Sequence, residues 1–265
     1  MKRIKARLEG IITPFIDRCV QARLNAHLAA ANTALEASSA GIVDLRDRLA
    51  KLEERLLDYY TNRWNMIDKA VDYLVGAEIP GDYFEFGVFK GRTFAYAVNT
   101  FSRVFPELRF IAVDSFAGLP ALQGLDAIGG YSSSFHEGQF ACSVEDFTNY
   151  ILEHGVDQTK VKLVIGWFNE SLCPGSPQIV GLDKVAVAWV DCDLYESTVP
   201  VLEFLTSRIS VGTLILFDDW HCFRNLGDYG EQRACREWLQ RNPQITLNPL
   251  VDFGFHGESF TVASC

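Results

Sequence analysis

Apolar and polar positions follow two different rhythms along the chain, and the change comes near residue 80. From Ile42 to Tyr59 the apolar residues recur at steps of three and four, with charged residues between them. This spacing is a heptad seam and predicts an amphipathic helix that packs against a partner. The seam is short, so two interpretations stay open. The helix packs on its own domain, or it joins two copies of the chain in a homo-oligomer.

Beyond Gly76 and Pro80, short apolar runs alternate with helix-length stretches. The runs are rich in Val, Ile, Leu and Phe, which is typical of strands that are buried on both faces of a parallel sheet. They lie at Tyr83–Phe86, Arg109–Val113, Val161–Ile165, Val185–Val190, Thr213–Phe217 and near Ile245–Val251. The alternation predicts an α/β domain over 63–265, with a mostly parallel central sheet flanked by helices. A separate N-terminal helical extension is expected over 1–62.

The segment from Gly118 to Gly138 interrupts this rhythm with five glycines and three successive serines. A long loop in a compact domain is often a lid over a functional site. A flexible connector is an equally good interpretation of the same composition.

Composition and charge narrow the class of protein. The chain has 265 residues, of which 48% are hydrophobic and 22% charged, so it is expected to fold around one large core. A formal net charge of −10 disfavours nucleic acid as a partner. The seven cysteines are scattered without a CxxC pair, which favours a reducing compartment. The chain shows neither a secretion signal nor a transmembrane segment, and we therefore expect a cytoplasmic protein.

A glycine-containing turn follows the first predicted strand. Residues 85–91 read Glu-Phe-Gly-Val-Phe-Lys-Gly, and glycines at such a turn let a ligand approach main-chain amides at a helix start. Asp114 closes the second strand 23 residues after Gly91, where an α/β nucleotide site places the carboxylate that binds ribose hydroxyls. Together these features predict an adenosine-bearing ligand that ends in an amino acid rather than a dinucleotide. A plain strand-to-helix turn is the alternative.

Acidic residues follow two further strands. Asp191-Cys192-Asp193 ends the fourth strand and Asp218-Asp219 ends the fifth, so both groups are expected at the edge of the sheet where ligands bind. Like charges ~4 Å apart repel by about 4 kcal/mol per pair at an effective dielectric constant near 20. A hard cation such as Mg²⁺ would relieve that repulsion. Alternatively, each Asp caps the helix after its strand, and this applies most to Asp193.

Five sequence blocks together resemble a known family. They are residues 82–88, 114–120, 166–168, 191–198 and 218–219. In order and spacing these blocks resemble the TylF/MycF (macrocin O-methyltransferase) family, over about Trp64 to Glu237. The specific blocks are Asp-Cys-Asp-Leu-Tyr-Glu-Ser-Thr and the Asp218-Asp219 pair, whereas the glycine turn is generic to class I methyltransferases. The resemblance implies a Rossmann-like class I methyltransferase fold, S-adenosylmethionine as methyl donor and Mg²⁺ as cofactor. It also implies O-methylation of a sugar hydroxyl in a glycosylated natural product.

The resemblance also implies roles for individual residues. The donor-binding set is Glu85 and Gly87 at the methionine end, Asp114 at the ribose, Trp167 and Phe168 near the adenine, and also Gly91 and Ser115. The implied metal ligands are Asp191, Asp218 and Asp219.

An alcohol is a poor nucleophile until its proton leaves, so the reaction needs a base. Asp191 is the expected base, and His136, His221 or His256 are candidates to assist it. Each histidine taken singly more often has an ordinary surface or core role. Catechol-type relatives of this fold carry a lysine three residues after the first metal-binding Asp. Leu194 stands at that position here, so a lysine base is not expected.

Two other functions remain as alternatives. Asp191-Cys192-Asp193 also reads as the D-x-D motif of a metal-dependent glycosyltransferase, but this leaves the glycine turn, Asp114 and the Asp218-Asp219 pair without a role. A non-catalytic assembly protein would use the Ile42–Tyr59 seam as its functional part. Methyl transfer to a small-molecule hydroxyl acceptor accounts for more of the residues.

Overall fold

The computed structural model describes residues 62–128, 134–254 and 256–265. Residues 62–265 form one compact unit of the chain. The predicted N-terminal extension and its heptad seam lie outside the described residues, apart from residue 62.

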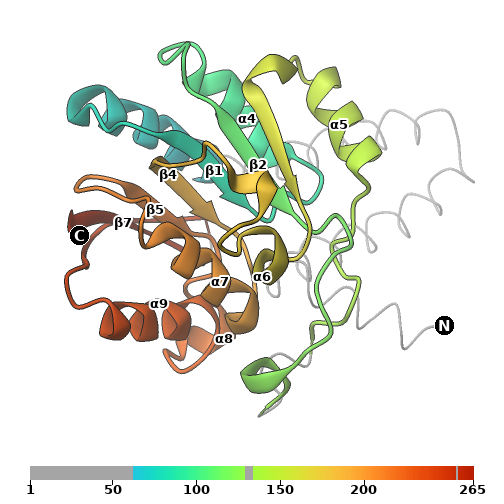
Figure 1. The fold of residues 1–265 in the computed structure, drawn as a ribbon, viewed down its shortest axis with the longest axis vertical. Helices are drawn as coiled ribbons and strands as arrows, with labels where there is room; N and C mark the ends of the chain where they lie inside the picture. The colour runs from blue at the N-terminus through green and yellow to red at the C-terminus, as the bar shows by residue number, and fades with distance from the viewer. Residues whose placement is uncertain (1–61, 129–133, 255) are drawn as a thin grey trace, which may run out of the picture. The chain divides into compact units, whose positions relative to one another are not determined.

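A seven-stranded sheet forms the centre of this unit, with strand order β3-β2-β1-β4-β5-β7-β6 (Figure 1). The first five strands in this order pair in parallel and the last two pairings are antiparallel. The strands are β1 (Asp82–Phe86), β2 (Phe110–Asp114), β3 (Val161–Ile165), β4 (Val185–Val190), β5 (Leu214–Phe217), β6 (Thr246–Phe253) and β7 (Gly257–Ser264). The predicted α/β class with a mostly parallel sheet is therefore confirmed.

The five parallel strands begin and end within one residue of their predicted positions. Their apolar runs make them easy to find in the sequence. All six residues of β4 are buried, whereas β3 at the sheet edge has only Val164 buried. Strand β7 was not predicted. It is rich in small and polar residues and lies between β5 and β6, where its Ser259 is buried and donates a hydrogen bond of 2.5 Å to the carbonyl of Val251.

Helices cover both faces of the sheet. One face carries the helix over 62–77, α4 (Arg92–Phe101) and α5 (Val144–Glu153). The other carries α6 (Phe168–Ser171), α7 (Tyr195–Leu205) and α9 (Gly230–Arg241). Short elements link them: η1 (Gly124–Ala127), η2 (Gln158–Lys160), η3 (Pro177–Ile179) and α8 (Cys222–Asn225). In Figure 1, the sheet lies between α4 and α5 above it and α6, α7 and α9 below it.

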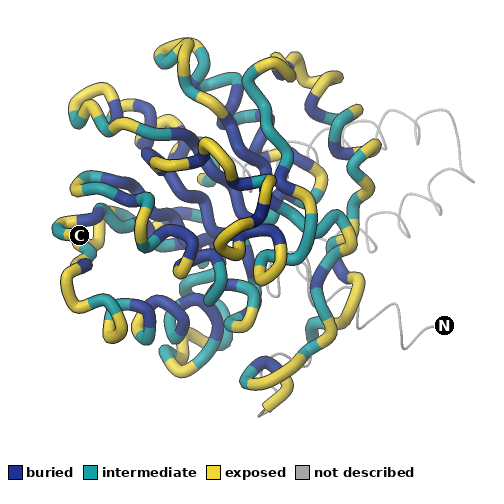
Figure 2. Tube along the Cα trace, in the orientation of Figure 1, coloured by how far each residue is buried: buried dark blue, intermediate teal, exposed yellow. Residues whose placement is uncertain are grey.

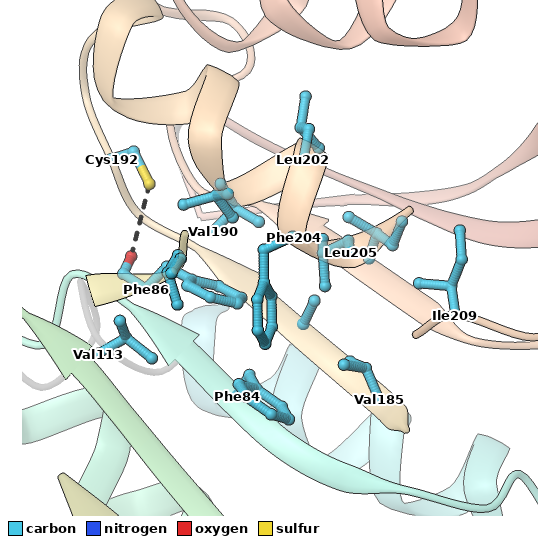
Figure 3. Close-up of a cluster of buried hydrophobic side chains, with 14 of the residues drawn as sticks. Phe84, Phe86, Val113, Val185, Val190, Cys192, Leu202, Phe204, Leu205 and Ile209 are labelled. Carbon is cyan, nitrogen blue, oxygen red and sulfur yellow. Dashed lines mark hydrogen bonds between the residues drawn. The ribbon is translucent and has the colours of Figure 1, made fainter. Parts of the chain in front are cut away.

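The core between the sheet and α7 shows how packing positions the strand ends. Phe84 and Phe86 of β1 stack with ring centroids 5.8 Å apart, and both contact Phe204 of α7 (Figure 3). All three side chains are at least 97% buried. Burying one large apolar side chain contributes roughly 1.5–3 kcal/mol, so this layer holds α7 firmly against the sheet. The buried residues concentrate in the strands and the helix faces that cover them (Figure 2).

Within the described residues, no helix is both long enough and apolar enough to cross a membrane.

Candidate functional site

The turn after β1 brings the ends of β1 and β4 together. Gly87 has a φ of 88°, and a Cβ placed there would lie 2.0 Å from the carbonyl oxygen of Asp191. Only glycine permits this approach. Gly91 has a φ of 79°, and a Cβ there would lie 2.8 Å from the ring of Phe147. Both the backbone conformation and the packing of Phe147 therefore favour glycine at this position.

Glu85 is a buried carboxyl group at the end of β1, with only 1% of its surface exposed. The hydroxyl of Tyr83 donates a hydrogen bond of 2.7 Å to its Oε2. Burial raises the pKa of Glu85 to about 8, although the bond from Tyr83 and the charge of Arg63 oppose the shift. A cationic ligand group at this position would favour the ionised form.

Asp114 ends β2 and organises the neighbouring turn. Its Oδ2 accepts hydrogen bonds from the backbone N–H groups of Val88 at 2.8 Å and Phe89 at 3.3 Å, and its Oδ1 accepts one from Phe116 at 2.7 Å. The backbone N–H groups of the glycine-containing turn, which were expected to face a ligand, therefore donate to Asp114 instead. Burial raises the pKa of Asp114 and these three bonds oppose the rise. A carboxylate has about four acceptor sites, so about one remains for a donor group of a ligand.

The predicted adenine-side residues lie at the same edge. The backbone N–H of Gly166, just before Trp167, donates a hydrogen bond of 2.9 Å to the carbonyl of Asp114. Trp167 is partly buried and immediately precedes α6. Phe168 packs edge-on against Phe86 with ring centroids 6.3 Å apart. The structure thus brings Asp114, Trp167 and Phe168 into one region.

Ser115 supports the loop that follows β2. Its Oγ donates to the carbonyl of Gly118 at 2.9 Å and accepts a hydrogen bond from the N–H of Ala117 at 3.1 Å. In this structure its hydroxyl shapes the local backbone.

Three carboxylates converge where β4 and β5 end. Asp191, Asp193 and Asp219 each offer one oxygen, and these oxygens all lie within 4.8 Å of one another. Asp193 has a φ of 57°, and the tight turn continues with a hydrogen bond of 2.5 Å from the N–H of Leu194 to the carbonyl of Cys192. Of the three metal ligands implied by the sequence, Asp191 and Asp219 belong to this group.

The prediction that Asp193 caps the following helix is wrong. The N-cap of α7 is Leu194, and no side-chain hydrogen bond comes from that residue. The first N–H groups of α7 donate instead to Asp126 of η1, from Tyr195 at 3.1 Å and from Glu196 at 2.9 Å. The only signal for Asp193 in the sequence was its position two residues after Asp191.

Asp218 pairs with a residue that sequence reasoning missed. Its buried carboxylate accepts a hydrogen bond from the guanidinium of Arg63, on the helix over 62–77, and forms an ion pair with it. Burial raises the pKa of Asp218 to about 7, and the charge of Arg63 opposes this rise. The sequence contains no motif that would connect two residues so far apart.

The converging acids are only partly compensated in the described part of the chain, where the charge of Arg63 opposes the rise in the pKa of Asp191 and Asp193. Burial raises the pKa of both Asp191 and Asp193, and the neighbouring charges of Asp218 and Asp219 raise both further. The Oδ2 of Asp219 is buried and has no hydrogen-bond partner among the described residues. Burying such an oxygen without a partner is costly. Carboxylate oxygens that lie within 4.8 Å of one another, from a group in which Oδ2 of Asp219 lacks a hydrogen-bond partner, fit a hard divalent cation such as Mg²⁺.

The three histidine candidates differ in their surroundings. His136 is exposed, and its Nδ1 lies 3.0 Å from the carbonyl of Glu137. His221 has Nδ1 3.0 Å from Oδ1 of Asn225 and Nε2 3.5 Å from Oε2 of Glu258. Burial lowers the pKa of His256 and the charge of Asp219 opposes the change. The charge of Asp219 therefore acts on His256, and burial favours the neutral form of its imidazole.

The described parts of the loop from Gly118 to Gly138 are tied to the domain. At its base, the N–H of Leu119 donates to the carbonyl of Gln139 at 2.7 Å, and the N–H of Gly138 donates to the carbonyl of Leu119 at 2.9 Å. Asp126 then connects the loop to the start of α7. The loop is anchored beside the acidic turn after β4.

Comparison with known families agrees with this arrangement. Residues 59–242 match the family described as Macrocin-O-methyltransferase (TylF). The chain belongs to this family. The predicted resemblance is thereby confirmed, over a range slightly longer than expected.

Curated proteins similar to this chain are named as O-methyltransferases. The chain is 30% identical over 161 residues to the Streptomyces olivaceus 8-demethyl-8-(2,3-dimethoxy-alpha-L-rhamnosyl)-tetracenomycin-C 4'-O-methyltransferase. It is 26% identical over 163 residues to the Micromonospora griseorubida mycinamicin III 3''-O-methyltransferase. These matches span 60% of this chain, and 60% and 62% of the respective relatives.

Solved structures from the same class share the fold. The O-methyltransferase NovP superposes with a TM-score of 0.64 and 26% identity, over 76% of this chain and 80% of NovP. The calicheamicin methyltransferase CalS11 superposes with a TM-score of 0.60 and 22% identity, over 88% of this chain and 90% of CalS11. The predicted Rossmann-like methyltransferase fold is confirmed.

Proposed function

We propose that this protein is an S-adenosylmethionine-dependent O-methyltransferase that uses Mg²⁺ and methylates a hydroxyl on the sugar of a glycosylated natural product. The observation that carries the proposal is the convergence of Asp191, Asp193 and Asp219 at the sheet edge that also holds Glu85 and Asp114. The names of the curated relatives, one of which contains a dimethoxy-rhamnosyl group on tetracenomycin C and the other mycinamicin III, support the choice of acceptor class.

The donor would bind along the carboxyl ends of β1, β2 and β3. Glu85 would face the amino group of the methionine end, because a buried carboxyl gains from an ammonium partner. Gly87 and Gly91 would form the tight turn that lies beside it. Asp114, with Ser115 next to it, would accept bonds from the ribose hydroxyls, and Trp167 and Phe168 would border the adenine.

The metal would be held by Asp191 and Asp219, with Asp193 as the third ligand that the geometry favours. Asp218 was also predicted as a ligand, but its carboxylate is paired with Arg63. Bound Mg²⁺ would lower the pKa of the acceptor hydroxyl and orient the substrate oxygens. Asp191, ionised beside the cation, would accept the hydroxyl proton.

His256 would assist this transfer as a neutral imidazole, since its pKa is lowered by burial. We keep His136 and His221 as weaker candidates for the same role. The acceptor oxygen would then attack the methyl carbon of the donor, forming the O–C bond as the C–S bond breaks, and S-adenosylhomocysteine would leave as a neutral thioether.

Isothermal titration and a methyl-transfer assay test this function together. The protein should bind S-adenosylmethionine, and should transfer a labelled methyl group to a member of a glycoside panel only when Mg²⁺ is present. Full activity in EDTA would remove Mg²⁺ from the proposal. Binding of a nucleotide sugar instead of the donor would favour the glycosyltransferase alternative. Homo-oligomeric assembly through residues 1–62 and a cytoplasmic location remain predictions that accompany this function.

A further inference from the structure

The first turn of α9 carries a buried acid that belongs to none of the sequence motifs described above. Glu231 exposes only 1% of its surface. It follows Gly230, the first residue of the helix, and lies 12 residues after Asp219 and 40 after Asp191. Burying a carboxylate near other acids is costly, so its presence requires a compensating contact.

Those contacts are with the backbone of both acidic turns. Oε2 of Glu231 accepts a hydrogen bond of 3.0 Å from the N–H of Asp219, after β5. Its Oε1 accepts a longer bond of 3.5 Å from the N–H of Cys192, after β4. One side chain therefore spans the two turns that supply the converging carboxylates. Figure 3 shows Cys192 on the β4 side, with its Sγ 3.8 Å from the carbonyl of Phe86.

The helix that carries Glu231 is itself firmly placed. Ala234, Cys235 and Trp238 are buried in the core, and Nε1 of Trp238 donates a hydrogen bond of 2.8 Å to Oγ1 of Thr206, just beyond α7. In the first turn of α9, Nε2 of Gln232 donates a hydrogen bond of 2.6 Å to the carbonyl of Trp220. Glu231 therefore reaches the acidic turns from a rigid support, which is the requirement for holding a site in one geometry.

We propose that Glu231 is a positioning residue for the divalent-cation site. By holding the N–H groups of Asp219 and Cys192, it fixes the two turns at the separation that lets Asp191, Asp193 and Asp219 contact one ion. This inference rests on the proposed metal-dependent function. Glu231 itself does not contact the ion.

The test measures Mn²⁺ binding to the full-length protein by electron paramagnetic resonance, which also reports the symmetry of the ion's ligands. Glu231→Gln keeps the size of the side chain but offers only one acceptor oxygen for two N–H groups. We expect its Kd for Mn²⁺ to rise at least tenfold and the Mn²⁺ spectrum to broaden. Affinity for S-adenosylhomocysteine, which measures the donor site, should stay within twofold. Glu237→Gln is the matched control, since it removes a charge from the same helix, where Glu237 bonds to Tyr195 and Arg233.

Two further variants separate positioning from charge and from folding. Glu231→Asp keeps the charge but is one methylene shorter, so positioning predicts a loss of Mn²⁺ affinity and a purely electrostatic effect predicts none. Glu231→Met replaces the carboxyl group with an apolar side chain of similar length and leaves the N–H groups of Asp219 and Cys192 without this acceptor, so urea unfolding is used to check that the variant is folded. It should still weaken Mn²⁺ binding at least tenfold.

The outcomes distinguish this inference from the proposed function. If Glu231→Asp and the folded Glu231→Gln protein bind Mn²⁺ within twofold of the natural protein, the positioning role is wrong and the metal site stands. If the natural protein binds neither Mn²⁺ nor Mg²⁺, the metal-dependent function fails, and the positioning role fails with it.

Discussion

Gly87 lies where the backbone of β1 turns against the end of β4. Two effects act there at once, because the residue has a φ of 88° and because a Cβ would lie 2.0 Å from the carbonyl oxygen of Asp191. Gly138 has a similar φ of 75°, but no atom lies within 4 Å of the Cβ position. An alanine at Gly138 therefore carries only the free-energy cost of the left-handed backbone, whereas an alanine at Gly87 carries that cost and the cost of a steric clash.

Gly87→Ala should destabilise the protein by more than Gly138→Ala does, measured as the free energy of unfolding in urea. Gly138→Ala should cost about 1 kcal/mol for the left-handed backbone alone. Gly87→Ala should cost more than this and should also weaken donor and Mn²⁺ binding, since the clash displaces Asp191. Equal losses of stability in the two variants, with ligand binding kept, would contradict the close approach.

The identity of the third metal ligand is also decided at single residues. Asp193→Asn and Asp219→Asn should each lower Mg²⁺-dependent methyl transfer at least tenfold, which is about 1.4 kcal/mol or more of transition-state stabilisation. Affinity for S-adenosylhomocysteine should stay within twofold in both. Asp218→Asn is the informative comparison, because its carboxylate pairs with Arg63. Strong loss in Asp218→Asn together with full activity in Asp193→Asn would support the set Asp191, Asp218 and Asp219.

Among the elements, α7 depends on a residue far away in the sequence. Its own N-cap, Leu194, makes no side-chain capping bond, and Asp126 of η1 accepts from the first two N–H groups of the helix. The contact is close enough that a Cβ on Gly124 would lie 2.0 Å from Oε1 of Glu196. The loop after β2 is thus bonded directly to the start of α7, the helix that follows the acidic turn.

Asp126→Ala should lower the free energy of unfolding by about 1 kcal/mol, the usual effect of losing a helix cap. Asp126→Asn retains an acceptor oxygen and should lose less than half of that. Thermal or urea unfolding followed by circular dichroism measures both. The interpretation fails if Ala and Asn destabilise the protein equally.

For the domain as a whole, the buried acids couple stability to pH. Burial raises the pKa of Glu85 to about 8 and of Asp218 to about 7, and it also raises the pKa of Asp191, Asp193 and Glu231. Each group has a higher pKa in the folded state than in the unfolded chain, so the folded state holds more protons. The corresponding stabilisation is complete below about pH 4 and is lost as the pH rises toward 8.

The metal-free protein should therefore melt at a lower temperature at pH 8 than at pH 6. Added Mg²⁺ should raise the melting temperature more at pH 8, because the cation binds the ionised acids and stabilises the folded state by mass action. Glu85→Gln, which cannot ionise, should show a smaller fall in melting temperature between the two pH values. A Mg²⁺ effect that is independent of pH would contradict the carboxylate cluster.

Sequence alone determined the parallel half of the sheet and the residues that line its edge. Long apolar runs ending in acids mark β1, β2, β4 and β5 locally, and the carboxyl ends of parallel strands necessarily share one edge. Strand β7 was not predicted, because its small and polar residues give only a weak alternation of apolar and polar positions. The family resemblance came from the order and spacing of the motifs, which can be read directly from the linear sequence.

Tertiary structure alone decided which acids converge and what holds them. The pairing of Arg63 with Asp218, the capping of α7 by Asp126 and the bonds from Glu231 to both acidic turns all join residues that lie from 12 to 155 positions apart. No local propensity encodes such contacts, because each depends on the direction of a side chain after the helices have packed. The sequence thus supplies the charges at the site, and the packing of helices on the sheet determines how those charges are paired.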